Sequence, residues 1–254
     1  MKLLTLARDL QRRRARERQQ LFVAEGIRAA EELLRSPLAV QGAIVGPTLA
    51  ASPRGDELRA SLDTAAFPVL EVGNREFASA ASTESPQGVL MIAAIPERTI
   101  TSLALPPNAR LLLLDGVQDP GNVGTLIRTA AAFGVAATLA LPGTVDLWNG
   151  KVVRSAMGAL FHHSVLPSTW EELDGFLAAR EIPAWGADAA GEALETLLPP
   201  FPRALAIAVG NEGAGLSPAA AGRLSRRIAI RTRPDVESLN VAVAAGILLH
   251  HFQP

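Results

Sequence analysis

The sequence contains no cysteine, and this absence excludes disulfide bonds, thiolate catalysis and cysteine-ligated zinc sites together. It also lacks any apolar run close to the roughly 18 to 20 residues of a membrane span. The amino-terminal segment becomes charged too early for the apolar region of a signal peptide. We therefore expect a cytoplasmic protein with no membrane partner and no cysteine-based metal site.

Net charge is nearly absent as well. A formal charge of −1 gives no overall attraction to nucleic acid, so a basic binding surface must be local. From Arg8 to Arg18 the sequence holds six arginines and two acidic residues, a pattern typical of the exposed part of a helix. Two interpretations stay open: a solvated helical face, or a surface that neutralises RNA phosphates. The RNA-binding residues under the second are Arg12, Arg13, Arg14, Arg16 and Arg18.

The chain of 254 residues is long enough for two domains. In its first part, strand-like and helix-like segments alternate, which predicts a small three-layer α/β domain over residues 1–97. The expected strands are 21–26, 40–46, 68–72 and 87–95, and the expected helices include 26–36 and 53–62. Residues 98–108 are rich in proline and show no helix-like or strand-like periodicity of apolar residues, so we interpret them as a linker.

Residues 109–254 predict a second α/β domain. Its expected strands are short, continuous apolar runs, which are typical of a mostly parallel sheet covered on both faces. These strands are 109–116, 135–141, 182–187, 204–210 and 227–231. Helices are expected at 122–134, about 151–159 and 238–252.

Two glycine-rich turns leave strands in this second domain: DGVQDPGNVGT (115–125) and GNEGAGLS (210–217). The first has the glycine spacing of a phosphate loop, but Asn122 and Val123 replace the lysine and hydroxyl that hold phosphate and magnesium. The second places Glu212 where a pyrophosphate would meet a helix. An ordinary doubly wound nucleotide enzyme is therefore disfavoured. The carboxylate of Glu212 indicates a cationic or hydroxyl-rich ligand, or a role in orienting neighbouring hydrogen-bond donors.

Ser238 and Asn240 stand at the start of the closing helix. Serine is a good N-cap, so capping alone accounts for Ser238 as well as a functional role does. Asn240 lies inside the expected first turn, which favours a ligand contact over capping.

The segments DPGNVGTLIRTAAAFGV, VGNEGAGLS and ESLNVAVAAGIL, in that order, resemble the three signature motifs of the SpoU-type (TrmH-like) RNA ribose 2′-O-methyltransferases of the SPOUT superfamily. KVVRSAMGALF is similar to the family's intervening segment. QQLFVAEGIRAAEELL and SPQGVL resemble a substrate-binding domain often found ahead of the catalytic one. The resemblance implies a C-terminal parallel-sheet domain with a deep trefoil knot, preceded by a smaller RNA-binding domain.

The same resemblance implies S-adenosylmethionine as cofactor and a homodimer with its active site near the subunit interface. No metal is expected from the residues themselves. It assigns the adenosine pocket to the backbone around Gly210, Ile230 and Leu239, with Val209 and Gly213 beside them. Glycine at 210 is expected because a side chain would block close backbone approach.

The catalytic set implied by the motifs is Arg128 with Asn122, Glu212, Ser238 and Asn240. Because guanidinium stays protonated, we expect Arg128 to grip a phosphate and stabilise the developing alkoxide, with a transient base role as the alternative. Arg128 could instead serve a structural role, in an ion pair with Asp115 or Asp119. The corresponding structural role for Glu212 is to interact with the dipole at a helix N-terminus. Arg128 lies nearly two turns beyond Asn122, so both are expected on one side of the helix.

The function expected is methylation of a ribose 2′-oxygen in structured RNA, with ribosomal RNA of the 23S type ahead of tRNA. A catalytically silent RNA-binding protein of the same fold is the rival. The adjacent pairs His162–His163 and His250–His251 project to different faces, which is poor geometry for a shared metal. The three tryptophans are too scattered for a stacking platform.

Overall fold

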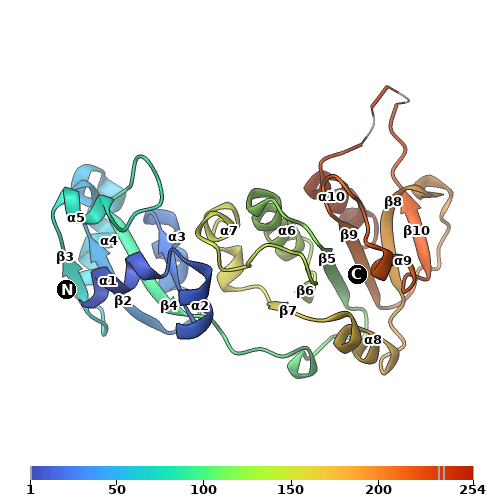
Figure 1. Cartoon of the computed structure of the whole chain (residues 1–254), viewed down its shortest axis with the longest axis horizontal. Helices are drawn as coiled ribbons and strands as arrows, with labels where there is room; N and C mark the ends of the chain where they lie inside the picture. Colours follow the sequence, from blue (N-terminus) through green and yellow to red (C-terminus); the bar gives the residue numbers. More distant parts are fainter. Residues whose placement is uncertain (1, 234, 237, 254) are drawn as a thin grey trace. The chain divides into compact units, whose positions relative to one another are not determined.

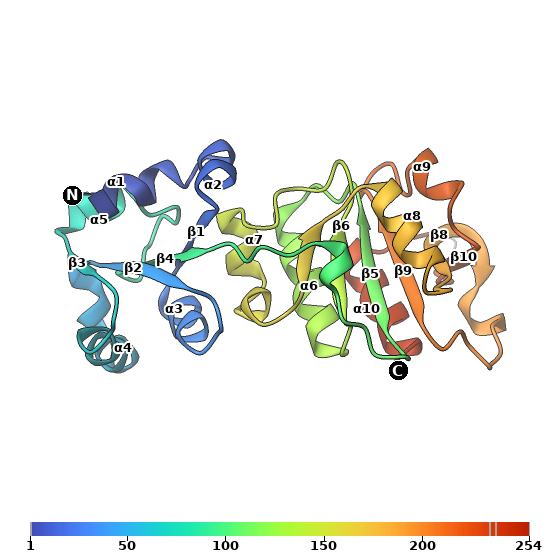
Figure 2. The same ribbon diagram turned by 90° about the horizontal axis from the view of Figure 1, so that it is seen from below.

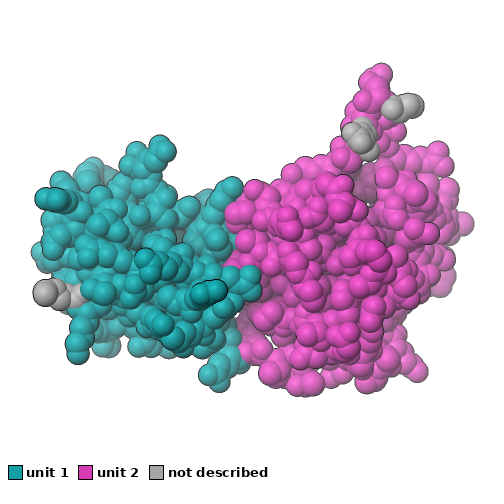
Figure 3. Space-filling view, viewed as in Figure 1, with its two compact units in different colours: residues 1–97, 148–162 teal, residues 98–147, 163–254 magenta. Residues whose placement is uncertain are grey.

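The computed structural model describes residues 2–233, 235–236 and 238–253. By contacts between residues the chain divides into two compact units, coloured in Figure 3. The first unit contains residues 1–97 and 148–162, and the second contains residues 98–147 and 163–254. The division into an RNA-binding domain and a catalytic domain stays a prediction.

The first unit is built on a four-stranded mixed sheet in the order β1-β4-β2-β3 (Figure 1). The strands are β1 (Leu21–Glu25), β2 (Val40–Val45), β3 (Val69–Glu71) and β4 (Val89–Ala94). Its helices are α1 (Lys2–Asp9), α2 (Arg13–Gln19), α3 (Ile27–Leu34), α4 (Pro53–Asp63), α5 (Asn74–Ala78) and α7 (Gly150–Ser155), with 3-10 turns η1 (Pro47–Ala51) and η3 (Ala159–Phe161). β4 is antiparallel to both neighbours, and β2 and β3 are parallel. The strands lie where the apolar runs predict them.

Residues 148–162 complete the core of this first unit. The ring of Trp148 lies 4.5 Å from that of Phe22, and the ring of Phe161 lies 5.7 Å from it. On α7, the guanidinium of Arg154 lies 3.7 Å from the buried carboxylate of Glu25. A segment far along the sequence therefore supplies aromatic and ionic contacts to β1.

The basic segment is divided between two helices, since α1 ends at Asp9 and α2 begins at Arg13. Arg12, Arg13, Arg14 and Arg18 are exposed, as expected of a solvated or RNA-binding face. Arg16 is the exception: it is 5% exposed, and its Nη1 donates to the carbonyl oxygens of Leu10 and Gln11 at 2.7 and 2.9 Å. The expectation of an exposed phosphate contact is wrong for Arg16, because its guanidinium satisfies the carbonyls left free where α1 ends.

The second unit contains a six-stranded sheet in the order β10-β8-β9-β5-β6-β7, with every neighbouring pair parallel. The strands are β5 (Arg110–Asp115), β6 (Ala137–Ala140), β7 (Val165–Pro167), β8 (Ala184–Ala193), β9 (Leu205–Gly210) and β10 (Arg226–Ala229). Its helices are α6 (Pro120–Ala132), α8 (Trp170–Ala178), α9 (Pro218–Ala221) and α10 (Val241–His251), with 3-10 turns η2 (Ile100–Ser102) and η4 (Leu194–Thr196). The prediction of a parallel sheet is confirmed.

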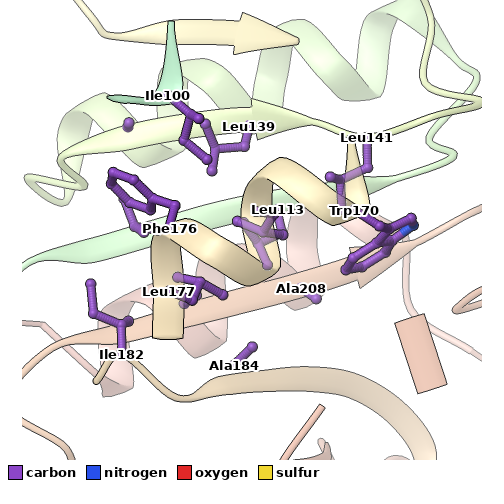
Figure 4. Packing of buried hydrophobic residues seen from close by; sticks show 14 of the residues in the cluster. Ile100, Leu113, Leu139, Leu141, Trp170, Phe176, Leu177, Ile182, Ala184 and Ala208 are labelled. Atoms are coloured by element: carbon purple, nitrogen blue, oxygen red, sulfur yellow. The ribbon is translucent and has the colours of Figure 1, made fainter. Parts of the chain in front are cut away.

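Helices cover both faces of this sheet. α6 and α10 pack against each other on one face, and α8 covers the other (Figures 1 and 2). Figure 4 shows the cluster beneath α8, in which Trp170, Phe176 and Leu177 lie against apolar side chains of β5, β6 and β9. Ile100 of η2, within the segment interpreted as a linker, is buried in the same cluster. Among the described residues, no helix is long and apolar enough to cross a bilayer.

His163 is a buried titratable group in the second unit. Its Nε2 lies 2.9 Å from the hydroxyl oxygen of Thr138 on β6. Burial, and next the charge of Arg98, lower the pKa of His163 to about 4. The imidazole is therefore neutral in the folded protein across the range in which it gains a proton in the unfolded chain.

Stability is expected to fall on acidification through this histidine. Because the folded pKa lies below the unfolded value of about 6.5, the unfolded state binds more protons between them, and the free energy of unfolding drops as pH falls. From pH 7 to pH 5 the loss is about 2 kcal/mol, measurable by urea denaturation. His163→Gln, which cannot titrate, is the control; an equal loss in that variant would assign the pH dependence to other groups.

Candidate functional site

The two glycine-rich turns meet at the carboxyl ends of two neighbouring parallel strands. Asp115, the last residue of β5, pairs in register with Gly210, the last residue of β9. The chain runs from β5 to β6 on one side and later returns to build β8, β9 and β10 on the other. The crevice where strand order reverses is the usual ligand site of a doubly wound sheet.

Side chains at the ends of β5 and β9 fix the loop 211–217. The carboxylate of Asp115 is 2% exposed, and it accepts hydrogen bonds from the backbone nitrogen and hydroxyl of Ser217 at 2.6 and 3.0 Å. Asn211 donates from Nδ2 to the carbonyl oxygen of Gly116 at 2.9 Å, and its Oδ1 accepts from the backbone of Gly213 at 2.9 Å. The two turns are therefore tied together.

Gly210 is required by this same loop. A Cβ at position 210 would lie 2.2 Å from the carbonyl carbon of Gly215 and 2.4 Å from the nitrogen of Leu216. Close backbone approach at Gly210 was expected from the sequence. In the structure the approaching backbone belongs to the chain's own loop, where Asn211 and Gly215 form a bridge.

Three residues of the predicted catalytic set form one hydrogen-bonded chain across the three motifs. Nδ2 of Asn122 donates to Oε1 of Glu212 at 3.0 Å, and Nδ2 of Asn240 donates to Oδ1 of Asn122 at 3.0 Å. Glu212 also accepts from the backbone nitrogens of Gln118 and Asp119 at 3.1 and 3.0 Å. Its carboxylate thus orients neighbouring donors, one of the roles that the sequence leaves open for it.

The pKa of Glu212 lies below its usual value. Burial opposes its ionisation, but hydrogen bonds from Asn122, from its own backbone and from Gln118 and Asp119 outweigh that effect. Glu212 is therefore ionised at neutral pH, and its lone pairs are engaged. It acts as a fixed anion in this site and is a weak candidate for taking up a proton.

Asn240 is the N-cap of α10, which corrects the expectation drawn from sequence. Its Oδ1 accepts from the backbone nitrogens of Ala242 and Val243 at 2.9 and 3.4 Å. Ser238 lies two residues ahead of the cap and is exposed. The helix begins later than its apolar pattern predicts, because Asn240 has non-helical backbone angles (φ −54°, ψ 137°) and supplies the capping oxygen.

Arg128 stands apart from this hydrogen-bonded chain. It is exposed on α6, and among the described residues it has no ion pair with Asp115, Asp119 or any other acid. Six residues at about 100° each place it about 120° around the helix axis from Asn122 and about 9 Å along it. The expectation that both face one side is therefore wrong. Within the part of the chain that the structure describes, no acidic side chain pairs with the guanidinium of Arg128.

The residues assigned to the cofactor differ in accessibility. Val209 is buried within β9, Gly213 is exposed in the loop after it, and Ile230 and Leu239 are half-buried. Ile230 directly follows β10, so it lies at the same edge of the sheet as Gly210. No group of three metal-ligating side chains occurs within the described part of the chain.

Comparisons with known proteins assign both parts of the chain. Residues 109–250 match the SpoU rRNA Methylase family, and residues 5–91 match the MRM3-like substrate binding domain. The chain is 34% identical over 251 residues to the 23S rRNA (guanosine(2553)-2′-O)-methyltransferase RlmP of Bacillus subtilis (strain 168), covering 97% of this chain and 94% of that protein.

Solved structures share the whole architecture. A protein from Porphyromonas gingivalis assigned to the TrmH family of RNA methyltransferases matches with a TM-score of 0.83 and 29% identity, over 99% of this chain and 97% of that one. The SpoU methyltransferase AviRb from Streptomyces viridochromogenes, solved with AdoMet, matches with a TM-score of 0.89 over 99% of this chain and 97% of that one. Its 23% identity makes it a likeness of fold.

Proposed function

This chain belongs to the SpoU rRNA Methylase family, and we propose that it methylates the 2′-oxygen of a ribose in 23S-type ribosomal RNA, with S-adenosylmethionine as donor. The observation that carries this proposal is the chain Glu212–Asn122–Asn240, which joins the three motifs at the carboxyl edge of the sheet. RlmP, which methylates 23S rRNA by its name, aligns over nearly the full length.

The residues at this edge fit a cationic, unphosphorylated cofactor. Leu216, Ile230 and Leu239 are half-buried aliphatic side chains after the ends of β9 and β10, and they offer apolar surface to an adenosine. Glu212 contributes an anion where a nucleotide would need cations. The backbone at Gly210, Ile230 and Leu239 would hold the cofactor, with Val209 and Gly213 beside it. When bound, S-adenosylmethionine supplies an electrophilic methyl group on a sulfonium.

The protein's own residues position the reacting hydroxyl and stabilise charge. Glu212 is held ionised by its donors and fixes the amide of Asn122, and Asn240 completes the arrangement while capping α10. Arg128 has a guanidinium that stays charged, so its proposed role is to bind the phosphate beside the target ribose and stabilise the developing alkoxide. Ser238, exposed ahead of the cap, is proposed to contact the ribose.

The first unit is proposed to recognise the RNA. Its arginines Arg12, Arg13, Arg14 and Arg18 are exposed, and neutralising phosphates requires such a local cluster. The match of residues 5–91 to a substrate-binding domain supports this role. A deep trefoil knot in the second unit, and a cytoplasmic location, belong to the same proposal.

We also propose a homodimer formed through α10. Val243 is 52% and Ile247 is 38% exposed, and their spacing of one helical turn places both apolar side chains on one face. A second copy of this face would bury them. Light scattering after gel filtration is expected to give the dimer mass for the wild type and the monomer mass for Val243→Glu with Ile247→Glu. A monomeric wild type would refute the dimer.

The function is tested by methyl transfer from labelled S-adenosylmethionine to unmodified 23S rRNA, large ribosomal subunits and tRNA in parallel, followed by mapping of 2′-O-methyl groups. Label at one ribose of 23S rRNA, free or in the subunit, is the expected result. Label found in tRNA alone would show that tRNA, and not 23S rRNA, is the substrate. Absence of both label and cofactor binding by calorimetry would favour a silent RNA-binding protein.

A further inference from the structure

A second arginine-rich segment lies in the catalytic unit, apart from the basic helices of the first unit. Residues 223–233 contain five arginines: Arg223, Arg226, Arg227, Arg231 and Arg233. Arg226 and Arg227 lie on β10, an edge strand of the parallel sheet, and the other three lie before or after it. Charged side chains on an edge strand commonly serve to prevent pairing with another chain, so each arginine must be judged by what it contacts.

The three arginines at or before β10 are committed to neighbours within the unit. Arg223 pairs with Asp174 of α8 at 2.7 Å. Arg226 lies 3.6 Å from Glu192, with its guanidinium 4.9 Å from the ring centre of Trp185. Arg227 pairs with Asp188 at 3.2 Å. These contacts attach the edge strand to β8 and α8, and they account for the three cations.

The two arginines beyond the end of β10 are not accounted for in this way. Arg231 is exposed, and it has no ion pair, hydrogen bond or ring contact with any described residue. Among the described residues, Arg233 forms an ion pair with Asp235 alone. The two side chains are 85% and 70% exposed, so water and salt weaken that pair. Both guanidinium groups are available to an anionic partner.

Their position relates them to the proposed active site. Because all strands of the sheet run parallel, Arg231 follows β10 at the edge where Glu212 follows β9. β8 alone separates these strands, so their ends are about 10 Å apart at the usual spacing. A polymer with one anionic phosphate per nucleotide, seated with its ribose at Glu212 and Asn122, passes within reach of this edge.

We propose that Arg231, assisted by Arg233, binds the RNA phosphates that flank the methylated nucleotide on the β10 side. This inference rests on the proposed function, because it takes the methylated RNA as the ligand. Arg231 contributes to RNA affinity and leaves the chemical step to Arg128. It differs from the basic helices of the first unit by acting beside the target nucleotide.

Salt dependence of RNA binding tests the proposal. Affinity for in-vitro-transcribed 23S rRNA is measured by filter binding from 50 to 200 mM salt for the wild type, Arg231→Ala and Arg231→Lys. Each phosphate contact contributes about 0.7 to 0.9 to the slope of log affinity against log salt. Arg231→Ala is expected to lose about one contact's share, and Arg231→Lys to retain it. Arg203→Ala removes an exposed arginine before β9 whose side chain has no ion pair with any described residue, and this variant is expected to keep the full slope.

Steady-state methylation of the same transcript separates binding from chemistry. Arg231→Ala is expected to raise KM for RNA about threefold to tenfold, with kcat and S-adenosylmethionine affinity unchanged. Equal slopes in the wild type and Arg231→Ala would overturn the proposal, as would a loss of cofactor affinity that explains the change in KM. If the wild type binds the transcript but methylates no RNA, the proposed function fails, whatever the slopes show.

Discussion

Replacing Arg128 by alanine is expected to lower the single-turnover rate of methyl transfer by about 10²- to 10³-fold at saturating cofactor and RNA, the usual cost of removing one preorganised electrostatic donor. The melting temperature is expected to stay unchanged, because Arg128 is exposed and has no ion pair among the described residues. Arg128→Lys keeps the positive charge but lacks the planar guanidinium with its paired donors, so its rate is expected to lie between those of the wild type and Arg128→Ala.

The matched control is Arg203→Ala, which also removes an exposed arginine from the second unit and is expected to methylate at the wild-type rate. A rate for Arg128→Ala within tenfold of the wild type would refute the electrostatic role while leaving the family assignment intact. A large fall in RNA affinity with no change in the saturated rate would instead assign Arg128 to binding.

Gly210→Ala is expected to abolish measurable methyl transfer and to lower the free energy of unfolding by about 1 to 3 kcal/mol, the usual cost of overpacking. The new Cβ would lie 2.2 Å from the carbonyl carbon of Gly215, and backbone cannot rotate away as a side chain does. The loop that carries Glu212 must move, so the contact between Glu212 and Asn122 is lost.

Gly175→Ala is the matched substitution for stability, measured by urea denaturation. Gly175 lies inside α8, and a Cβ there would meet nothing within 4 Å, so this change is expected to raise stability by about 0.5 to 1 kcal/mol. If Gly210→Ala is as stable and as active as Gly175→Ala, the loop is not held by the contact that the structure shows.

The strands around the site were predictable from local pattern. β5 and β9 are continuous apolar runs that end in glycine-containing turns, and these features need no knowledge of distant residues. α8 was missed, although Thr169 and Glu172 form a capping box at its start, a signal that sequence alone provides. α10 was predicted three residues too long at its start, because apolar periodicity does not reveal which polar residue caps.

The contacts within the site depend on partners far apart in the chain. The bond between Asp115 and Ser217 spans 102 residues, so the sequence offered Asp115 only as an ion-pair partner for Arg128. Arg16 was also mispredicted from the sequence. It belongs to a basic cluster along the chain, but its guanidinium is buried against the end of α1 and is removed from the surface. Local charge and apolar period do not encode such packing.

The membership of residues 148–162 in the first unit affects how relatives can be recombined. In this chain the rings of Trp148 and Phe161 pack on Phe22. A chimera that takes residues 1–97 from a relative would replace Phe22 by the relative's residue while keeping the native Trp148 and Phe161. The same exchange would separate Glu25 from the arginine on α7 with which it pairs. Under the proposal that the first unit recognises the RNA, transferring its specificity to a relative would require exchanging residues 1–97 and 148–162 together, because both segments build that unit.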